Sequence, residues 1–256
     1  MRFGLIAGVG LVALSLSTTV TPAQATPVTD NEFFSAGEGA WGNTPEPGTI
    51  AGLLVAQFDN VFAPTNDLLE IGIPGKAGFS IIFDDGQSLI NFLPAQGQAG
   101  PLTADLLDPT SSSAGFFAGE VATLAINIAF SDAGLIAHPA GTAFGDLEFT
   151  GLTGALSSLN GETIRSLLPE VNVLLGGGTE AFTINDVAET LIDTNQAFGG
   201  GSNGEGASTF ALNNLEFPTV VTAVPEPPLW PIFFIGSVLA IFLSRRRSGE
   251  ARLGAG

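Results

Sequence analysis

The sequence contains no cysteine and no tyrosine, and its only histidine is His138. Without cysteine the fold cannot depend on disulfide bonds, and thiol catalysis and thiolate metal sites are excluded. A lone histidine cannot supply a multi-histidine metal site, and no Gly-x-Ser-x-Gly nucleophile motif accompanies it. We therefore expect His138 to be a loop residue beside the turn at Pro139 rather than a catalytic group.

Basic residues are also scarce, with 7 Lys and Arg against 25 Asp and Glu and a net charge of −18. Between Thr26 and Val224 the two bases Lys76 and Arg165 are set against 23 acids, which leaves a net charge of −21. A surface this acidic repels phosphate backbones, so nucleic-acid binding by electrostatics is excluded. Lys76 and Arg165 are expected to form ion pairs, which contribute little free energy if they are exposed.

The amino-terminal segment, residues 1–25, has the organisation of a secretory signal peptide. Its parts are a positive charge, an apolar segment and an Ala-x-Ala cleavage site, at Arg2, Phe3–Leu16, and Ala23 and Ala25. We expect signal peptidase to cleave after this site, so that the mature chain begins at Thr26. The alternative is an uncleaved membrane anchor, which the Ala-x-Ala site disfavours.

The carboxyl-terminal segment, residues 224–247, carries a second set of targeting features. They are a triplet, an uncharged and mostly apolar run and a basic cluster, at Pro225, Glu226 and Pro227, Leu229–Leu243, and Arg245, Arg246 and Arg247. As a helix the run would span roughly 22 Å, which is short of a hydrocarbon core of about 30 Å. The flanks still indicate a transmembrane segment, because arginine clusters stop transfer on the cytoplasmic side and prolines end the helix on the other. Residues 248–256 would form a cytoplasmic tail.

This order of triplet, apolar run and arginines resembles the PEP-CTERM sorting signal of bacterial surface proteins. The resemblance implies that an exosortase-type membrane transpeptidase recognises the segment and that cleavage occurs near Pro225, Glu226 and Pro227. It also implies a transient anchor in the inner membrane, followed by delivery to the cell surface or the extracellular space. The alternative is a permanent single-span anchor, because a thinned bilayer can accommodate a run of this length.

Between the targeting segments, residues 26–223 are long enough for a single compact α+β domain with its own core. Apolar residues at helical spacing predict four main helices, near 49–62, 115–130, 163–175 and 184–198. Short apolar runs between turn residues predict a small sheet, with strands near 69–73, 79–83 and 145–151.

The segment Ala114–Phe130 fits two secondary structures. Apolar residues alternate as in a strand from Leu124 to Phe130, and they also recur at helical spacing from Phe117 to Ile128. A segment this long without proline exceeds the usual length of a strand, which favours the helix. If the segment instead paired in a sheet, the domain would be mostly β.

Local signals mark several element ends. Thr183 and Asp186 have the spacing of a capping box, and the glycine triplets 176–178 and 199–201 are expected to end the helices before them. Pro169 interrupts the third predicted helix, which it should kink or restart.

A shorter segment, Ser88–Leu93, fits either a hairpin strand or a one-turn helix ended by Pro94. The preceding Asp84-Asp85-Gly86 is expected to be a turn between two apolar runs. The same residues could begin a calcium loop, but the alternating acids and the final glutamate of an EF-hand are missing.

Four runs of the body carry a second likeness: GAWGNTPEPGTIAGLLVAQFDNVF, INFLP, AGEVATLAINIAFSDAG and FGDLEFTGLTGALSSLNGETIRSLLPEVNVLLGGG. They resemble a module of secreted bacterial surface proteins over most of residues 38–217. Members often have Leu-Asn-Gly-x-Thr-Val near residues 159–164, then a helix ending in LGGG, and Pro169 departs from the usual helix. The shared motifs are caps, glycines and core residues, so the resemblance implies a structure and no activity.

One further acidic pattern is a candidate for chemistry. Asp146 and Glu148 would share one face of a strand and could imitate the carboxylate pair of a glycosidase. A solvated strand face is the plainer interpretation, because 23 acids are spread through the body.

These observations favour a non-enzymatic, exported surface or extracellular-matrix protein without a cofactor or a metal site. Its expected partners are signal peptidase, an exosortase-type transpeptidase, the membrane and, as a candidate, exopolysaccharide. Two alternatives stay open, a secreted hydrolase acting on polysaccharide and a calcium-dependent adhesin module. The hydrolase would require two carboxylates about 5–10 Å apart in a cleft.

Overall fold

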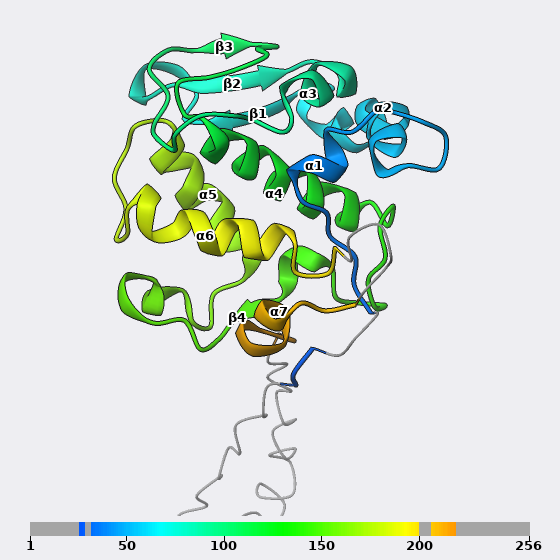
Figure 1. The fold of residues 1–256 in the computed structure, drawn as a ribbon, viewed down its shortest axis with the longest axis vertical. Coiled ribbons are helices and arrows are strands. Elements are labelled where there is room, and N and C mark those ends of the chain that lie inside the picture. The colour runs from blue at the N-terminus through cyan, green and yellow to red at the C-terminus, as the bar shows by residue number, and fades with distance from the viewer. Residues whose placement is uncertain (1–25, 29–31, 200–205, 219–256) are drawn as a thin grey trace, which may run out of the picture. The chain divides into compact units, whose positions relative to one another are not determined.

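The computed structural model describes residues 26–28, 32–199 and 206–218, and Figure 1 shows how their elements are arranged. The helices are α1 (Glu38–Trp41), α2 (Ile50–Phe62), α3 (Gly86–Phe92), α4 (Phe116–Asp132), α5 (Ile164–Leu175), α6 (Ile184–Asn195) and α7 (Thr209–Asn214). The strands are β1 (Leu69–Gly72), β2 (Ser80–Phe83), β3 (Leu106–Leu107), β4 (Glu148–Phe149) and β5 (Leu215–Glu216). The predicted signal cleavage site, the sorting triplet, the membrane segment and the arginine cluster lie outside the described residues.

The mixed α+β class is confirmed, and α2, α4, α5 and α6 correspond to the four predicted helices. Three of these helices begin at a threonine whose side-chain oxygen accepts a hydrogen bond from the first turn: Thr49, Thr163 and Thr183. The predicted capping box is also present, because the Thr183 amide donates to Asp186 Oδ2 at 2.8 Å while Thr183 Oγ1 accepts from the Asp186 amide. Such caps satisfy amide groups that have no partner within the helix.

Helix α4 lies between the other elements and explains its own ambiguous sequence pattern (Figure 1). Every residue from Phe117 to Ile128 is buried. A helix that is enclosed on all sides has no single apolar face, so its apolar residues also fall at alternate positions. The segment is therefore helical, as its length indicated.

The small sheet has the order β1-β2-β3 and lies at one end of the fold (Figure 1). Strands β1 and β2 are antiparallel, with Leu69 opposite Phe83, and they confirm the two strands predicted at 69–73 and 79–83. Strand β3 pairs parallel to β2 and was not among the predicted strands. Two residues are too few for an alternating pattern to show in the sequence.

For residues 84–92 the sequence predicted a turn at Asp84-Asp85-Gly86 and left Ser88–Leu93 open between a strand and a short helix. Asp85 is the N-cap of α3, because its Oδ1 accepts a hydrogen bond from the Ser88 amide at 2.6 Å. Of the two alternatives for Ser88–Leu93, the helical one holds. Helix α3 packs closely on α2, since a side-chain carbon at Gly86 would lie 2.9 Å from Val55 Cα.

Two further boundaries differ from expectation. The strand predicted at 145–151 is reduced to β4, because residues 144–146 form a 3₁₀ turn in which the Ala143 amide donates to Asp146 Oδ2. Helix α6 ends at Asn195, before the predicted residue 198, and Gly199 does not cap it. The Phe198 amide instead donates to Ser35 Oγ at 3.1 Å, which directs the chain away from the helix axis.

Two residues that were singled out in the sequence belong to helix α5 or adjoin it, Pro169 in its middle and Gly176 directly after its end. Gly176 caps α5, as predicted, and its amide donates to the Asn172 carbonyl. Helix α5 runs through Pro169 as one helix from Ile164 to Leu175, so the proline does not divide it.

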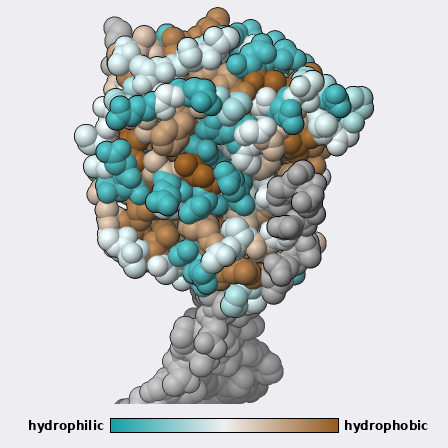
Figure 2. All heavy atoms as spheres, viewed as in Figure 1, coloured by the Kyte–Doolittle hydropathy of each residue, from teal (hydrophilic) through white to brown (hydrophobic). Residues whose placement is uncertain are grey.

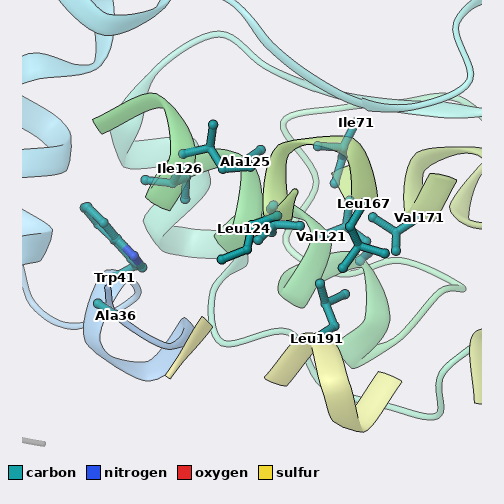
Figure 3. Packing of buried hydrophobic residues seen from close by; sticks show 14 of the residues in the cluster. Ala36, Trp41, Ile71, Val121, Leu124, Ala125, Ile126, Leu167, Val171 and Leu191 are labelled. Carbon is teal, nitrogen blue, oxygen red and sulfur yellow. The ribbon is translucent and has the colours of Figure 1, made fainter. Parts of the chain in front are cut away.

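The core is centred on α4. Figure 3 shows Val121 and Leu124 facing Leu167 and Val171 of α5, with Leu191 of α6 close by. These side chains are fully buried, and burial of each large apolar side chain contributes about 1.5–3 kcal/mol. The helices that surround α4 are therefore held in place mainly by apolar contact with it.

Candidate functional site

A cluster of polar side chains lies inside the fold where α1, α4 and α6 meet. We call its members the buried polar cluster: Glu38, Glu120, Thr123, Asn127 and Asn195. The two glutamates are 7% and 6% exposed, and the other three are 0% exposed. Carboxyl groups are rarely buried to this extent unless they are paired, so their contacts require an explanation.

The spacing of α4 brings three members to one side of the helix. Glu120, Thr123 and Asn127 follow one another at intervals of three and four residues, which places them on a common face. Gly119 lies beside them and allows α1 to approach, since a side-chain carbon there would lie 2.6 Å from Glu38 Oε1. The glycine that costs helix propensity thus makes room for the glutamate of α1.

The side-chain amide of Asn127 accepts hydrogen bonds at its oxygen and donates them from its nitrogen. Its Oδ1 accepts hydrogen bonds from the Ala36 amide at 3.0 Å and from Trp41 Nε1 at 3.1 Å. Its Nδ2 donates to the Ala36 carbonyl at 2.9 Å and to Asn195 Oδ1 at 3.2 Å. One side chain therefore binds both the backbone before α1 and the indole at its end.

Asn195 continues this network to a carboxyl group. Its Nδ2 donates to Glu120 Oε2 at 2.7 Å and to the Glu120 carbonyl at 2.9 Å. Glu38 is held from another direction, because its Oε2 accepts a hydrogen bond from the Ala95 amide at 2.8 Å. The carboxyl groups of Glu38 and Glu120 lie within hydrogen-bonding reach of each other.

The enclosure changes the acidity of both carboxyl groups. Burial, followed by the charge of Glu120, raises the pKa of Glu38 to about 8. Burial also raises the pKa of Glu120, while hydrogen bonds from Asn195 and Glu38 oppose this rise. At neutral pH the pair therefore retains a proton, which Glu38 can donate to Glu120.

Two carboxyl groups that share a proton can act as an acid and a base, but these two are closed off. A cavity of about 260 Å³ is lined by residues of α1 and of the chain before it, together with Gln196 and Gly199, and neither glutamate lines it. A larger cavity of about 410 Å³ lies where α5 ends and α6 begins, and Glu180 is its only titratable lining residue. The geometry suits a structural role for the pair better than contact with a substrate.

The outer surface in Figure 2 alternates between hydrophilic areas and small hydrophobic ones. Within residues 26–28, 32–199 and 206–218, the large apolar residues that are exposed come from separate parts of the sequence: Val55, Phe79, Leu107 and Leu212. Isolated apolar residues of this kind are usual on a protein surface.

The candidate carboxylates Asp146 and Glu148 do not share one strand face. Asp146 lies in the 3₁₀ turn before β4, and its Oδ1 accepts a hydrogen bond from Arg165 Nη2 at 2.8 Å. Glu148 lies in β4 and pairs across the strands with Glu216. The expectation of a common face is wrong because Leu147 separates a turn from a strand of only two residues.

Arg165 forms the ion pair expected of it. Its Nη1 and Nη2 donate to the two carboxylate oxygens of Asp132 at 2.6 and 2.8 Å. Hydrogen bonds to Asp132, and then to Asp146, raise the pKa of Arg165 above its ordinary value. The arginine therefore stays charged and joins the end of α4 to α5.

The other two candidates occupy local structural positions. His138 Nδ1 lies 2.9 Å from the Pro139 carbonyl, beside the proline turn as predicted. Among the described residues there is no group of three or more acids or histidines placed to hold a metal ion. Asp84 lies beside Asp108, and burial and then the charge of Asp108 raise its pKa.

Sequence reasoning missed the buried polar cluster. One signal was available, because Glu120 is the only charge in the apolar run from Phe116 to Phe130. No pattern marked Glu38, since its partner is 82 residues further along the chain and only the packing of α1 on α4 brings them together.

Within the described part of the chain, no helix combines the length and the apolar character needed to cross a membrane. The predicted span 229–243 lies outside that part. Comparisons of this chain with family models, with curated proteins and with solved structures found no match.

Proposed function

We propose that this chain is an exported bacterial surface or extracellular-matrix protein of the PEP-CTERM type, processed by an exosortase. The observation that carries the proposal is the order of three features within residues 224–247. The triplet Pro225, Glu226 and Pro227 precedes an uncharged, mostly apolar run, and Arg245, Arg246 and Arg247 follow it. Arginines resist transfer across a bilayer, so the chain would pause with the triplet at the outer face of the inner membrane.

The described body is consistent with a non-enzymatic role after export. Its core does not rely on disulfides, because the sequence has no cysteine, and 23 acids in residues 26–224 favour solubility through self-repulsion. Arg165 and Asp146 form an ion pair, and His138 lies beside the turn at Pro139. The remaining carboxyl pair, Glu38 and Glu120, is enclosed and hydrogen-bonded within the protein.

Mass spectrometry of the exported protein tests this proposal. The expected mature chain begins at Thr26 and ends near residue 227. Glu226→Ala should block the second cleavage, so that peptides beyond the triplet remain attached. Glu250→Ala, a substitution of the same kind downstream of the arginines, should leave processing unchanged. An intact peptide containing Arg252 on the surface form would refute processing.

The polysaccharide is the partner class to be tested after export is established. A glycan array with the exported protein should show binding of neutral glycans, and the mass of the glycans should stay unchanged. Release of shortened glycans would instead support the hydrolase. Calorimetry with calcium separates the adhesin alternative, because binding would produce heat and raise Tm.

A further inference from the structure

Among the described residues, the carboxyl groups of Glu38 and Glu120 form a closed acidic pair without a basic partner. Neither forms an ion pair with the described Arg165 or His138, which are engaged elsewhere. Glu38 Oε1 is buried and accepts no hydrogen bond from a neutral donor. Two ionised carboxylates in contact and shielded from water would repel each other strongly. A proton between them removes one charge and provides the missing hydrogen bond.

The segment that Glu38 belongs to depends on contacts with the rest of the fold. Helix α1 has only four residues, and a helix this short is not stable by itself. Besides Glu38, the polar attachments of the segment Phe33–Trp41 are backbone, hydroxyl and indole groups. The Phe34 amide donates to the Ala137 carbonyl and Ser35 Oγ accepts from the Phe198 amide, while the Ala36 backbone and Trp41 Nε1 are bound to Asn127. None of these groups titrates in the physiological range, so the carboxyl pair is the attachment that responds to pH.

We propose that Glu38 and Glu120 share one proton and thereby latch the segment Phe33–Trp41 to α4 and α6. Loss of that proton places two negative charges in contact, which releases the segment while the core around α4, α5 and the sheet stays folded. This proton latch follows from the described residues and does not rest on export or processing of the chain.

The segments around the latch contain few other titratable residues, so we assign its pH response to Glu38 and Glu120. Glu38 is the only titratable residue of Phe33–Trp41, and the loop from Leu93 to Gln96 that contacts it has none. On α4 the other acid is Asp132, which is paired with Arg165. On α2 the acid is Asp59, which is exposed.

Helix α6 contributes three acids, none of which hydrogen-bonds with the pair. Asp186 caps its own helix at Thr183, which lowers the pKa of Asp186. Glu189 is exposed, and burial and then Glu189 raise the pKa of Asp193. The causes that act on the pair are its burial, its mutual contact and the hydrogen bonds from Ala95 and Asn195.

Hydrogen–deuterium exchange of the full chain tests the latch. The reporters are the amides of Ala36, which donates to Asn127, and Ala95, which donates to Glu38. Between about pH 6 and about pH 9.5 their protection should fall by about tenfold or more, after correction for the intrinsic exchange rate. Amides of α5 serve as the internal reference and should keep their protection.

Two variants imitate the proton. In Glu38→Gln the amide nitrogen can donate to Glu120 while the amide oxygen still accepts from Ala95. In Glu120→Gln the amide can donate to Glu38 while its oxygen accepts from Asn195. Both should hold the segment at high and low pH alike, and either one suffices if the other fails to fold. Glu46→Gln, at an exposed position, should release the segment on the wild-type curve.

Three outcomes would overturn the latch. Protection of Ala36 and Ala95 could stay constant across the pH range, or both glutamine variants could release the segment on the wild-type curve. Calcium chloride could also restore protection at high pH in the wild type but not in Glu38→Gln, which would mean that the pair binds a cation in place of the proton.

Discussion

Trp41 Nε1 donates a hydrogen bond to Asn127 Oδ1 at 3.1 Å, which joins the end of α1 to the middle of α4. The same oxygen also accepts from the Ala36 amide, so one amide group secures a segment that is about 90 residues away in the sequence. The central helix is thus attached to its surroundings by specific polar contacts as well as by apolar packing.

Asn127→Ala should lower the free energy of unfolding by about 2–4 kcal/mol, because it leaves several buried polar groups without partners. Denaturant unfolding measures this loss. The matched control is Asn91→Ala, at an exposed position where the side chain accepts one hydrogen bond from Gln87, and it should change stability by about 0.5 kcal/mol or less. Equal losses in the two variants would show that the contacts of Asn127 are not important for stability.

The stability of the whole domain should fall as the pH rises from mildly acidic to mildly basic. The folded state holds the pKa of Glu38 at about 8, above the ordinary value of 4.5, so the folded state binds more protons in this window. The contribution of Glu38 is therefore complete below about pH 4.5 and is lost as the pH passes through about 8. Thermal unfolding at about pH 9 should give a Tm roughly 4–8 °C below that at about pH 5.

Glu38→Gln provides the control for this pH dependence. A glutamine has no proton to lose, so its Tm should change much less over the same window. A Tm that rises from about pH 5 to about pH 9 in the wild type would contradict the raised pKa of Glu38.

Gly119→Ala should destabilise the domain by about 1–3 kcal/mol, although alanine is the better helix former. The added carbon would lie 2.6 Å from Glu38 Oε1 and 2.7 Å from Ala95 Cβ. Gly39→Ala is the control, because a side-chain carbon at that position of α1 meets nothing within 4 Å. Differential scanning calorimetry should find a lowered Tm for Gly119→Ala and an unchanged Tm for Gly39→Ala. A lowered Tm for Gly39→Ala alone would contradict this packing.

Arg165→Lys should cost about 0.5–1 kcal/mol at low salt, because lysine cannot bind both oxygens of Asp132 at once. The side chains are 41–43% exposed, so about 1 M sodium chloride should remove most of the difference. Asp59→Asn, an exposed acid without an ion pair among the described residues, should show a smaller effect. A difference that persists undiminished in high salt would show that the weakened ion pairs with Asp132 and Asp146 are not its cause.

Much of the fold was predictable because its signals are local. The threonine caps and the helical spacing around α2, α5 and α6 lie within a few residues of one another. The errors arose where a contact from elsewhere decided the outcome. Helix α6 stops at Asn195, and beyond it the Phe198 amide donates to Ser35 Oγ of a distant segment. The local pattern left Ser88–Leu93 open between strand and helix, and in the fold these residues belong to α3, which packs on α2 at Gly86.

The sequence by itself determined the charge of the body, the absence of cysteine chemistry, the order of the two expected targeting segments and most helices, because each depends on composition or on neighbours in the chain. Only the tertiary structure decided that Glu38 and Glu120 meet inside the protein. Their contact requires α1 to pack on α4 at Gly119, and such a long-range approach leaves no periodic trace in the sequence. The same burial that conceals the pair is what raises the pKa of Glu38.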